Sequence, residues 1–410
     1  MTTQVGPTVL PAVAPSAERV SWAYVGDASE RDLRVDFMRG LATVSVVIVH
    51  VEFFSLFNFL FWERIGSVSS AEFFVVLSGF VLGQVSLKRV SQQGLQGASW
   101  KIWDRAVLLY RNLLAVNLLA ALVAQVPIWD TTPLTTFVDR GANAVYSLYP
   151  GPGTDLYVWI GRWLLLRMGP YQVQVLGLYT CFFVCAPAAL YLLSKGRVRW
   201  LLTLSWVGYF AQRAAPSQPT GAMFEYAFPL LTWQVLFVHG LAAGYHREQL
   251  LAFYSRWRKL LRSAALVLAA AFCFFALNSP NRFIPEYARL SIIPEDVFSS
   301  VSGQFFSKEQ LGLLRLLNIA VLLVVCGELL TCAWVPLRAG LGWFFIPLGQ
   351  ASLYIFTVHV PLVLITSHLV PFGYTTEAPA LLRNTVAHML CLAVVWLLVR
   401  YRVLFRWIPH

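Results

Sequence analysis

About ten apolar stretches, separated by polar or charged segments, are the feature that most constrains this chain. Most of them approach the roughly 20 residues that a helix needs to cross the hydrocarbon core of a bilayer. They cover residues 40–61, 71–87, 106–126, 171–193, 198–212, 222–244, 263–279, 311–335, 343–369 and 382–399. The sequence therefore predicts an all-α polytopic membrane protein with about ten transmembrane helices.

The composition excludes an ordinary soluble domain. Charged residues make up 12% of the 410 residues, hydrophobic residues 58%, and the mean hydropathy is +0.64. Soluble domains carry about 25% charged residues. The net charge of +11 does not indicate nucleic acid binding, because the basic residues lie between the apolar stretches. There they would set the orientation and contact anionic membrane lipid.

The distribution of Lys and Arg predicts that both termini are cytoplasmic. With the N-terminus inside, about 20 of the 31 basic residues fall in inner segments, as the positive-inside rule requires. The short stretch 198–212 is kept as a helix, since dropping it would move the basic segment 247–262 outside. We expect a multi-pass protein of the cell inner or plasma membrane. Residues 1–28 lack the features of a signal peptide, and we interpret them as a disordered cytoplasmic tail before a membrane domain at 29–410.

The motifs of several enzyme classes are absent from the sequence. The six cysteines lie inside apolar stretches, with no metal-ligand spacing and no disulfide pattern in an extracytoplasmic segment. A hydrolase elbow, a phosphate-binding loop and a paired-histidine zinc motif are also missing. We therefore expect no metal and no nucleophilic serine relay.

Arg39 and His50 are the main candidates for chemistry. They are eleven residues apart, close to three helical turns, so both face nearly the same side, about 16 Å apart along the axis. With Arg39 at the inner surface, His50 lies near mid-bilayer, where an ionisable side chain indicates function. A neutral histidine that joins two helices is the alternative. Asp36 lies three residues before Arg39 and is expected to pair with it.

Glu72, at the start of the second stretch, is the expected partner of His50. A carboxylate on one imidazole nitrogen would fix the tautomer and leave the other nitrogen as a base. This arrangement requires the first two helices to be neighbours. A carboxylate in water at the outer surface is the alternative.

Basic side chains gather at the inner ends of the second and third stretches: Lys88, Arg89, Lys101 and Arg105. With Arg39 they would form a rim that holds the phosphates of a nucleotide-bearing donor. Charge that only sets the topology is the alternative. Arg111 lies inside the third stretch, where an arginine needs a cavity or a partner.

Further polar residues are candidates for substrate contact. Ser352 and His359 are seven residues apart in the ninth stretch and share a helix face; Asp36 is a third candidate. In the outer segments 127–170 and 280–310, aromatic rings are mixed with carboxylates and amides, which suits the binding of a sugar. An aromatic belt at the membrane interface is the alternative.

Three segments carry a resemblance to a known family. Arg39 and His50, with ten residues between them, resemble the Arg-x10-His motif of the membrane acyltransferase type 3 superfamily. Segments 31–42, 70–80 and 348–359 are similar to the OpgC family, which is associated with succinylation of osmoregulated periplasmic glucans. The similarity is specific over the first 80 or so residues of the membrane domain and supportive near residue 350.

The resemblance implies acyl transfer across the membrane by an acyltransferase type 3-like bundle. The donor would be a cytoplasmic acyl-CoA, with succinyl-CoA favoured and acetyl as the second choice, and the acceptor an extracytoplasmic glycan hydroxyl. By position, His50 would be the catalytic histidine and Arg39 the arginine near the donor, with Arg105 and Arg111 as further basic residues. His50 would act as a general base or carry the acyl group covalently; the base is favoured.

Two other classes stay open at this stage. A transporter or flippase for a glycan or lipid-linked precursor would use His50 and His359 as proton relays, but inverted repeats and paired broken helices are not visible. A structural partner of an envelope synthesis complex would use its polar residues only to join helices. The sequence makes no prediction of the oligomeric state.

Overall fold

A computed structural model describes residues 23–24, 31–139, 144–370 and 376–409. The predicted tail, residues 1–28, lies outside these ranges apart from residues 23 and 24. The longer helices are α1 (Leu33–His50), α3 (Ser70–Val123), α6 (Val175–Ser194), α7 (Val198–Ala214), α8 (Leu230–Tyr245), α9 (Arg247–Leu277), α11 (Leu313–Cys332), α14 (Ser352–Leu369) and α15 (Ala378–Arg400). The shorter α-helices are α2 (Asn58–Phe61), α4 (Thr132–Thr135), α5 (Leu156–Leu164), α10 (Glu295–Phe305), α12 (Trp334–Leu337) and α13 (Trp343–Gln350).

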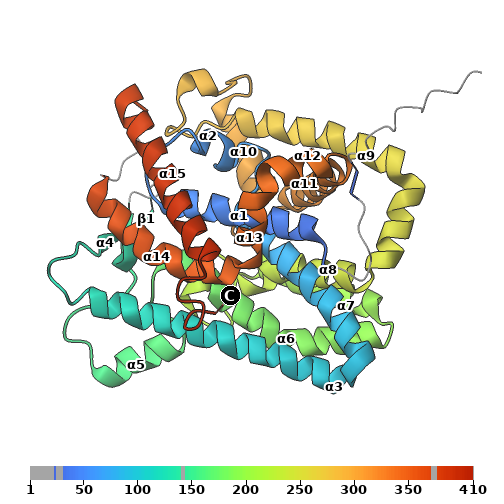
Figure 1. Cartoon of the computed structure of the whole chain (residues 1–410), viewed down its shortest axis with the longest axis horizontal. Helices are drawn as coiled ribbons and strands as arrows, with labels where there is room; N and C mark the ends of the chain where they lie inside the picture. The colour runs from blue at the N-terminus through green and yellow to red at the C-terminus, as the bar shows by residue number, and fades with distance from the viewer. Residues whose placement is uncertain (1–22, 25–30, 140–143, 371–375, 410) are drawn as a thin grey trace, which may run out of the picture.

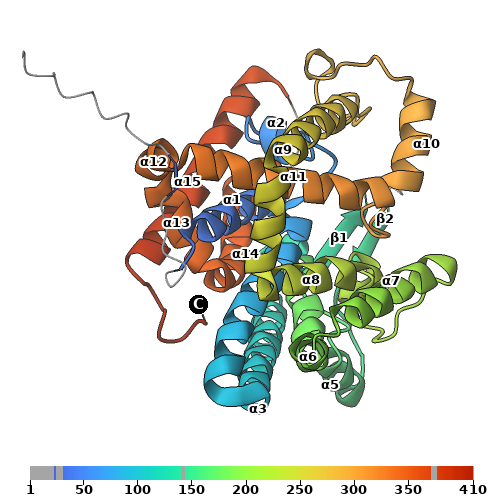
Figure 2. The same cartoon turned by 90° about the vertical axis from the view of Figure 1, so that its right-hand side faces the viewer.

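Six of the described helices are long and apolar enough to cross a membrane: α3, α6, α9, α11, α14 and α15. The short stretch predicted at 198–212 is helical as α7. The second and third stretches are joined in α3, which bends at Gly94, where φ is 73°; glycine takes this value without a steric penalty. Figures 1 and 2 show the two arms of α3 diverging from the bend. A mainly helical, multi-pass fold is confirmed, whereas the count of ten and the orientation stay predictions.

The expectation of an all-α chain is wrong in one place. Strands β1 (Thr136–Asp139) and β2 (Ala144–Ser147) pair as an antiparallel ribbon, with Phe137 opposite Tyr146. The two segments are rich in β-branched and aromatic residues, which favour strands. They lie between apolar stretches, where the search for membrane helices gave no prediction.

Helix α1 lies in the middle of the bundle, next to α13, α14 and α15 (Figure 1). Two glycines allow α1 and α13 to approach closely. A Cβ atom at Gly40 would overlap the carbonyl oxygen of Phe345, and one at Gly349 would overlap that of Asp36. This backbone contact fixes how far α1 can slide along α13, and therefore where Arg39 and His50 lie.

Asp32 anchors the start of α1. Its carboxylate accepts from the N–H of Arg34 at 3.1 Å, as an N-cap does, and pairs with Arg34 and with Arg247 of α9, each at 2.8 Å. Burial opposes ionisation of Asp32, but the two arginines outweigh this effect and lower the pKa of its carboxyl group. The charged form therefore holds α1 to α9 at neutral pH.

Helix α1 ends at His50, so the apolar stretch 40–61 is not one helix. Val51 is extended, with φ −88° and ψ 101°, and helix resumes only at α2. Three side chains of α15 bind the last turn of α1 and the irregular backbone after it. Asn384 donates to the Phe54 carbonyl at 2.8 Å, Thr385 accepts from the Leu56 N–H at 3.1 Å, and His388 lies 3.1 Å from the Ile48 carbonyl. Irregular backbone is tolerated inside a membrane where the protein supplies such partners. The break places His50 at a helix end.

Candidate active site

Two side chains of α14 meet the two motif residues of α1. Arg39 donates to the Ser352 hydroxyl at 2.5 Å, and Nδ1 of His50 lies 2.8 Å from Nε2 of His359. The two imidazole rings are stacked, with centroids 5.0 Å apart. The structure therefore brings four predicted residues together in two pairs, one near each end of the motif.

The hydrogen bonds of the histidine pair indicate which nitrogens carry protons. Nδ1 of His359 lies 3.0 Å from the carbonyl oxygen of Ile355, which can only accept, so this nitrogen is the protonated one. In a neutral His359, Nε2 is then an acceptor, and Nδ1 of His50 donates to it. Nε2 of His50 keeps its lone pair and is available as a base.

His359 is a buried partner of His50. Its side chain is buried, with 1% of the residue exposed, and it lines neither of the cavities described below. Substrate contact by His359 stays a prediction. What the structure describes is its position behind the His50 ring, where it orients that ring and sets its tautomer.

A cavity of about 520 Å³, which we call the Arg39 cavity, lies between α3, α6 and α14. Its basic lining residues are Arg39, Arg89, Lys101 and Arg105, and Asp104 is the one carboxylate among its lining residues. Ser352 also lines it, whereas most of the remaining wall is aliphatic or aromatic. Guanidinium and ammonium groups beside an apolar wall suit a ligand with an anionic head and an apolar arm.

A second cavity of about 130 Å³, which we call the His50 cavity, contains His50 itself. The Tyr171 ring stands edge-on to the His50 ring, at 5.9 Å between centroids, and the Tyr171 hydroxyl donates to Glu52. Lys308 also lines this cavity, and no described residue forms an ion pair with it. Phe74 and Phe356 line both cavities, so these two rings lie where the two spaces adjoin.

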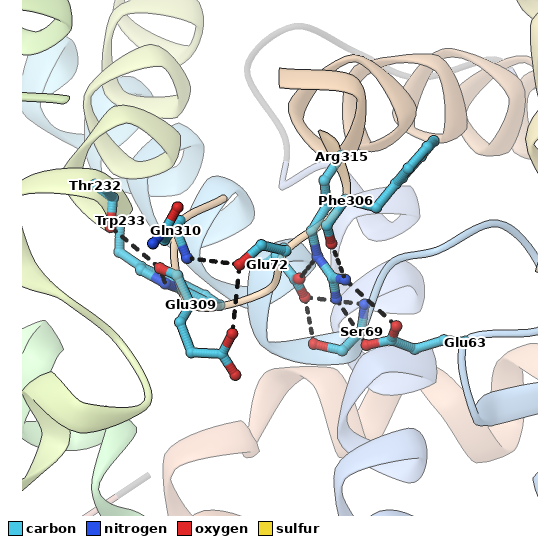
Figure 3. A network of polar contacts seen from close by, with 10 residues as sticks. Glu63, Ser69, Glu72, Thr232, Trp233, Phe306, Glu309, Gln310 and Arg315 are labelled. Carbon is cyan, nitrogen blue, oxygen red and sulfur yellow. Dashed lines mark hydrogen bonds and ion pairs between the residues drawn. The ribbon is translucent and has the colours of Figure 1, made fainter. Parts of the chain in front are cut away.

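Glu72 does not contact His50. One carboxylate oxygen accepts from the N–H of Ser69 at 2.9 Å and from its hydroxyl, which forms a capping box at the start of α3. The other oxygen pairs with Arg315 of α11 at 2.5 Å, and Arg315 also pairs with Glu63 at 2.7 Å (Figure 3). The side chains of Glu72 and Arg315 are 0% and 2% exposed. The predicted contact with His50 is therefore wrong, because this carboxylate joins α3 to α11.

Asp36 and Arg111 lie away from both cavities. Asp36 pairs with Arg31 at 2.6 Å instead of Arg39, and it lines neither space. Of the two predicted α3 arginines, Arg105 reaches the Arg39 cavity, whereas Arg111 is exposed on the helix surface. Six residues turn a helix by about 240° beyond one full turn, so the two arginines face different sides. The expected cavity contact of Arg111 is wrong.

A family model covers the part of the chain that contains both cavities. The model described as OpgC protein matches residues 31–407. This chain belongs to the OpgC family. Family membership indicates a membrane-embedded acyltransferase of glycans. No curated protein and no solved structure gives a significant match. The matched range includes every residue that lines either cavity, so in this OpgC family member both spaces lie within the shared domain.

Sequence reasoning missed four residues of the site: Tyr171, Lys308, Phe74 and Phe356. Lys308 precedes the stretch 311–335 and belongs to no motif, so only the fold places it beside His50. Phe74 lies in the segment 70–80 that resembles the family, and that resemblance was the one signal that pointed to it.

Proposed function

We propose that this OpgC family member is an acyl-CoA-dependent O-acyltransferase that moves an acyl group from the cytoplasm to a hydroxyl of an extracytoplasmic glycan. The observation that carries the proposal is the position of His50, whose unprotonated nitrogen belongs to a ring that lines one cavity. Phe74 and Phe356 line both this cavity and a second, basic one. Donor and acceptor can therefore approach one imidazole from different spaces.

The Arg39 cavity supports CoA as the donor. The nucleotide of CoA carries several phosphate charges, which the four basic side chains of this cavity would bind by charge-assisted hydrogen bonds. The apolar wall would take the pantetheine arm. Keeping the nucleotide in this cavity avoids the cost of moving a charged group across the bilayer.

His50 acts as a general base in this proposal. The glycan hydroxyl gives its proton to Nε2 of His50 while its oxygen forms a C–O bond to the thioester carbonyl carbon. The C–S bond then breaks, and the CoA thiolate takes the proton from the imidazolium. A positioned base of this kind contributes about 10²–10⁴-fold to a rate. Attack by Nε2 on the thioester is the covalent alternative, and rapid-quench trapping of an acyl-histidine distinguishes it.

Lys308 supports succinyl as the transferred group, with acetyl as the second candidate. Its ammonium group belongs to the cavity of His50 and would attract the free carboxylate at the far end of a succinyl group. We propose an osmoregulated periplasmic glucan as the acceptor, on the strength of the family. The Lys and Arg distribution supports the orientation with both termini in the cytoplasm.

Mass spectrometry of the glycans tests the function. Purified protein in detergent is incubated with succinyl-CoA or acetyl-CoA and with periplasmic glucan. We expect a mass increase of one succinyl group on the glucan and release of free CoA. Glucan that is never acylated by any donor contradicts the proposal, and export of unmodified glucan from vesicles would favour the transporter instead.

A matched pair of arginines in α3 tests the donor cavity. Arg105→Gln is expected to raise KM for acyl-CoA by about 10–100-fold, because a hydrogen bond to a charged group contributes about 1.5–3 kcal/mol. Arg111→Gln is expected to leave KM unchanged, since Arg111 lies outside the cavity. Steady-state kinetics with purified variants measures both values. Equal effects of the two substitutions would place the donor elsewhere.

A further inference from the structure

Phe74 and Phe356 form a wall between the Arg39 cavity and the His50 cavity. Phe74 lies in the second turn of α3 and Phe356 in α14, with ring centroids 5.2 Å apart in an edge-to-face contact. Both residues are buried, at 2% and 5% exposure, and both line each cavity. The two cavities are therefore both bounded by this one pair of aromatic rings in contact.

Phe356 contacts the partner of the proposed base, whereas Phe74 lies beside a buried structural ion pair. Phe356 lies three residues before His359, and the two rings are edge-to-face with centroids 6.0 Å apart. Phe74 follows Glu72 by two residues. The bonds of Glu72 to Ser69 and Arg315 therefore fix the helix turn that carries the Phe74 ring. A ring can rotate about its side-chain bonds while these helices stay in place.

From these observations, and resting on the function proposed above, we propose that Phe74 and Phe356 are the partition through which the acyl end of the donor reaches His50. The nucleotide stays in the Arg39 cavity, and the acyl thioester passes between the rings. When no donor is present, the two rings close a path that would otherwise let water reach the thioester from the acceptor side. Apolar constrictions of this kind exclude water in other membrane proteins.

The partition also sets which acyl groups pass. The His50 cavity has a volume of about 130 Å³, a quarter of the 520 Å³ of the Arg39 cavity. This space accepts a short acyl chain and excludes a long one, provided that both rings stay in place. Phe74 and Phe356 are therefore residues that determine specificity in the transfer reaction, alongside the base.

Substitution of either ring tests the proposal. Purified Phe74→Ala and Phe356→Ala variants are assayed with succinyl-CoA and octanoyl-CoA, with and without glucan. We expect the ratio of octanoyl to succinyl transfer to rise by at least about 10-fold, since a single methylene in a fitted apolar pocket already changes rates by about 10–200-fold. We also expect faster release of CoA without glucan, because water enters the opened passage. Phe182→Ala is the control, since Phe182 is a buried phenylalanine of α6 that lines neither cavity.

The outcomes separate this inference from the proposed function. An unchanged acyl ratio and unchanged hydrolysis in both variants, with transfer intact, overturn the partition and leave the acyltransferase standing. Absence of transfer by the unmodified protein with any donor overturns both. Should an alanine variant fail to fold, Phe74→Leu and Phe356→Leu give the same comparison with a smaller opening, and an unchanged ratio in both again overturns the partition.

Discussion

Replacing His50 with alanine is expected to lower acyl transfer by about 10²–10⁴-fold, the usual contribution of a positioned general base. The loss follows from removal of the one imidazole that lines the His50 cavity. Initial rates of succinyl-glucan formation by purified protein measure it. His239→Ala is the matched control, because His239 is a partly buried histidine of α8 that lines neither cavity. A His50→Ala variant with the rate of the unmodified protein would remove His50 from the mechanism.

His359 provides a second test of the same assignment. His359→Leu removes the acceptor for Nδ1 of His50. We expect the transfer rate to fall by about 10–100-fold, which is the loss seen when metal-binding histidines lose the hydrogen-bond partner that orients their ring. His359→Gln keeps an acceptor oxygen and is expected to retain more of the rate. Equal losses in both variants would mean that His359 only fills space.

The second large effect concerns stability. Arg315→Met is expected to lower the free energy of unfolding by about 3–5 kcal/mol, because it leaves the buried Glu72 and the neighbouring Glu63 without their cation. Thermal unfolding in detergent measures the change. Arg258→Met is the control: it breaks a half-exposed ion pair with Glu328, for which about 1 kcal/mol or less is expected.

A Glu72 variant, measured by the same thermal unfolding and by the transfer assay, distinguishes a structural role of this residue from a catalytic one. Glu72→Gln is expected to lower stability, since the buried arginine then keeps only Glu63 as a charged partner. The acyl transfer rate per folded molecule is expected to stay within a few fold of the starting value, because Glu72 does not touch His50. A Glu72→Gln protein of full stability that has lost its activity would restore the carboxylate to the catalytic site.

The sequence predicted which residues share a face of one helix, but it did not predict which residues of different helices are in contact. Eleven residues from Arg39 to His50 and seven from Ser352 to His359 placed each pair on one face. The two hydrogen bonds that join these helices connect residues 313 and 309 positions apart. Glu72 was assigned to the wrong partner for the same reason, since its cation lies 243 residues farther along the chain.

The end of α1 was missed for a different reason. Hydropathy does not distinguish helical from extended apolar residues, so the stretch 40–61 read as one span although the helix stops at His50. The sequence did contain the compensating groups: Asn384 and His388 are polar residues spaced one turn apart in an apolar helix. Polar residues in such positions need a partner, and here the partner is the broken backbone of another helix.

Transfer across a sealed bilayer is the most direct test of the account. The protein is reconstituted into vesicles, its orientation is read from protease cleavage of a terminal tag, and succinyl-CoA and glucan are placed on opposite sides. We predict succinyl-glucan when the donor is on the side of the Arg39 cavity, none when the two substrates are exchanged, and none with His50→Ala. Product that forms only when both substrates share one side would contradict the account.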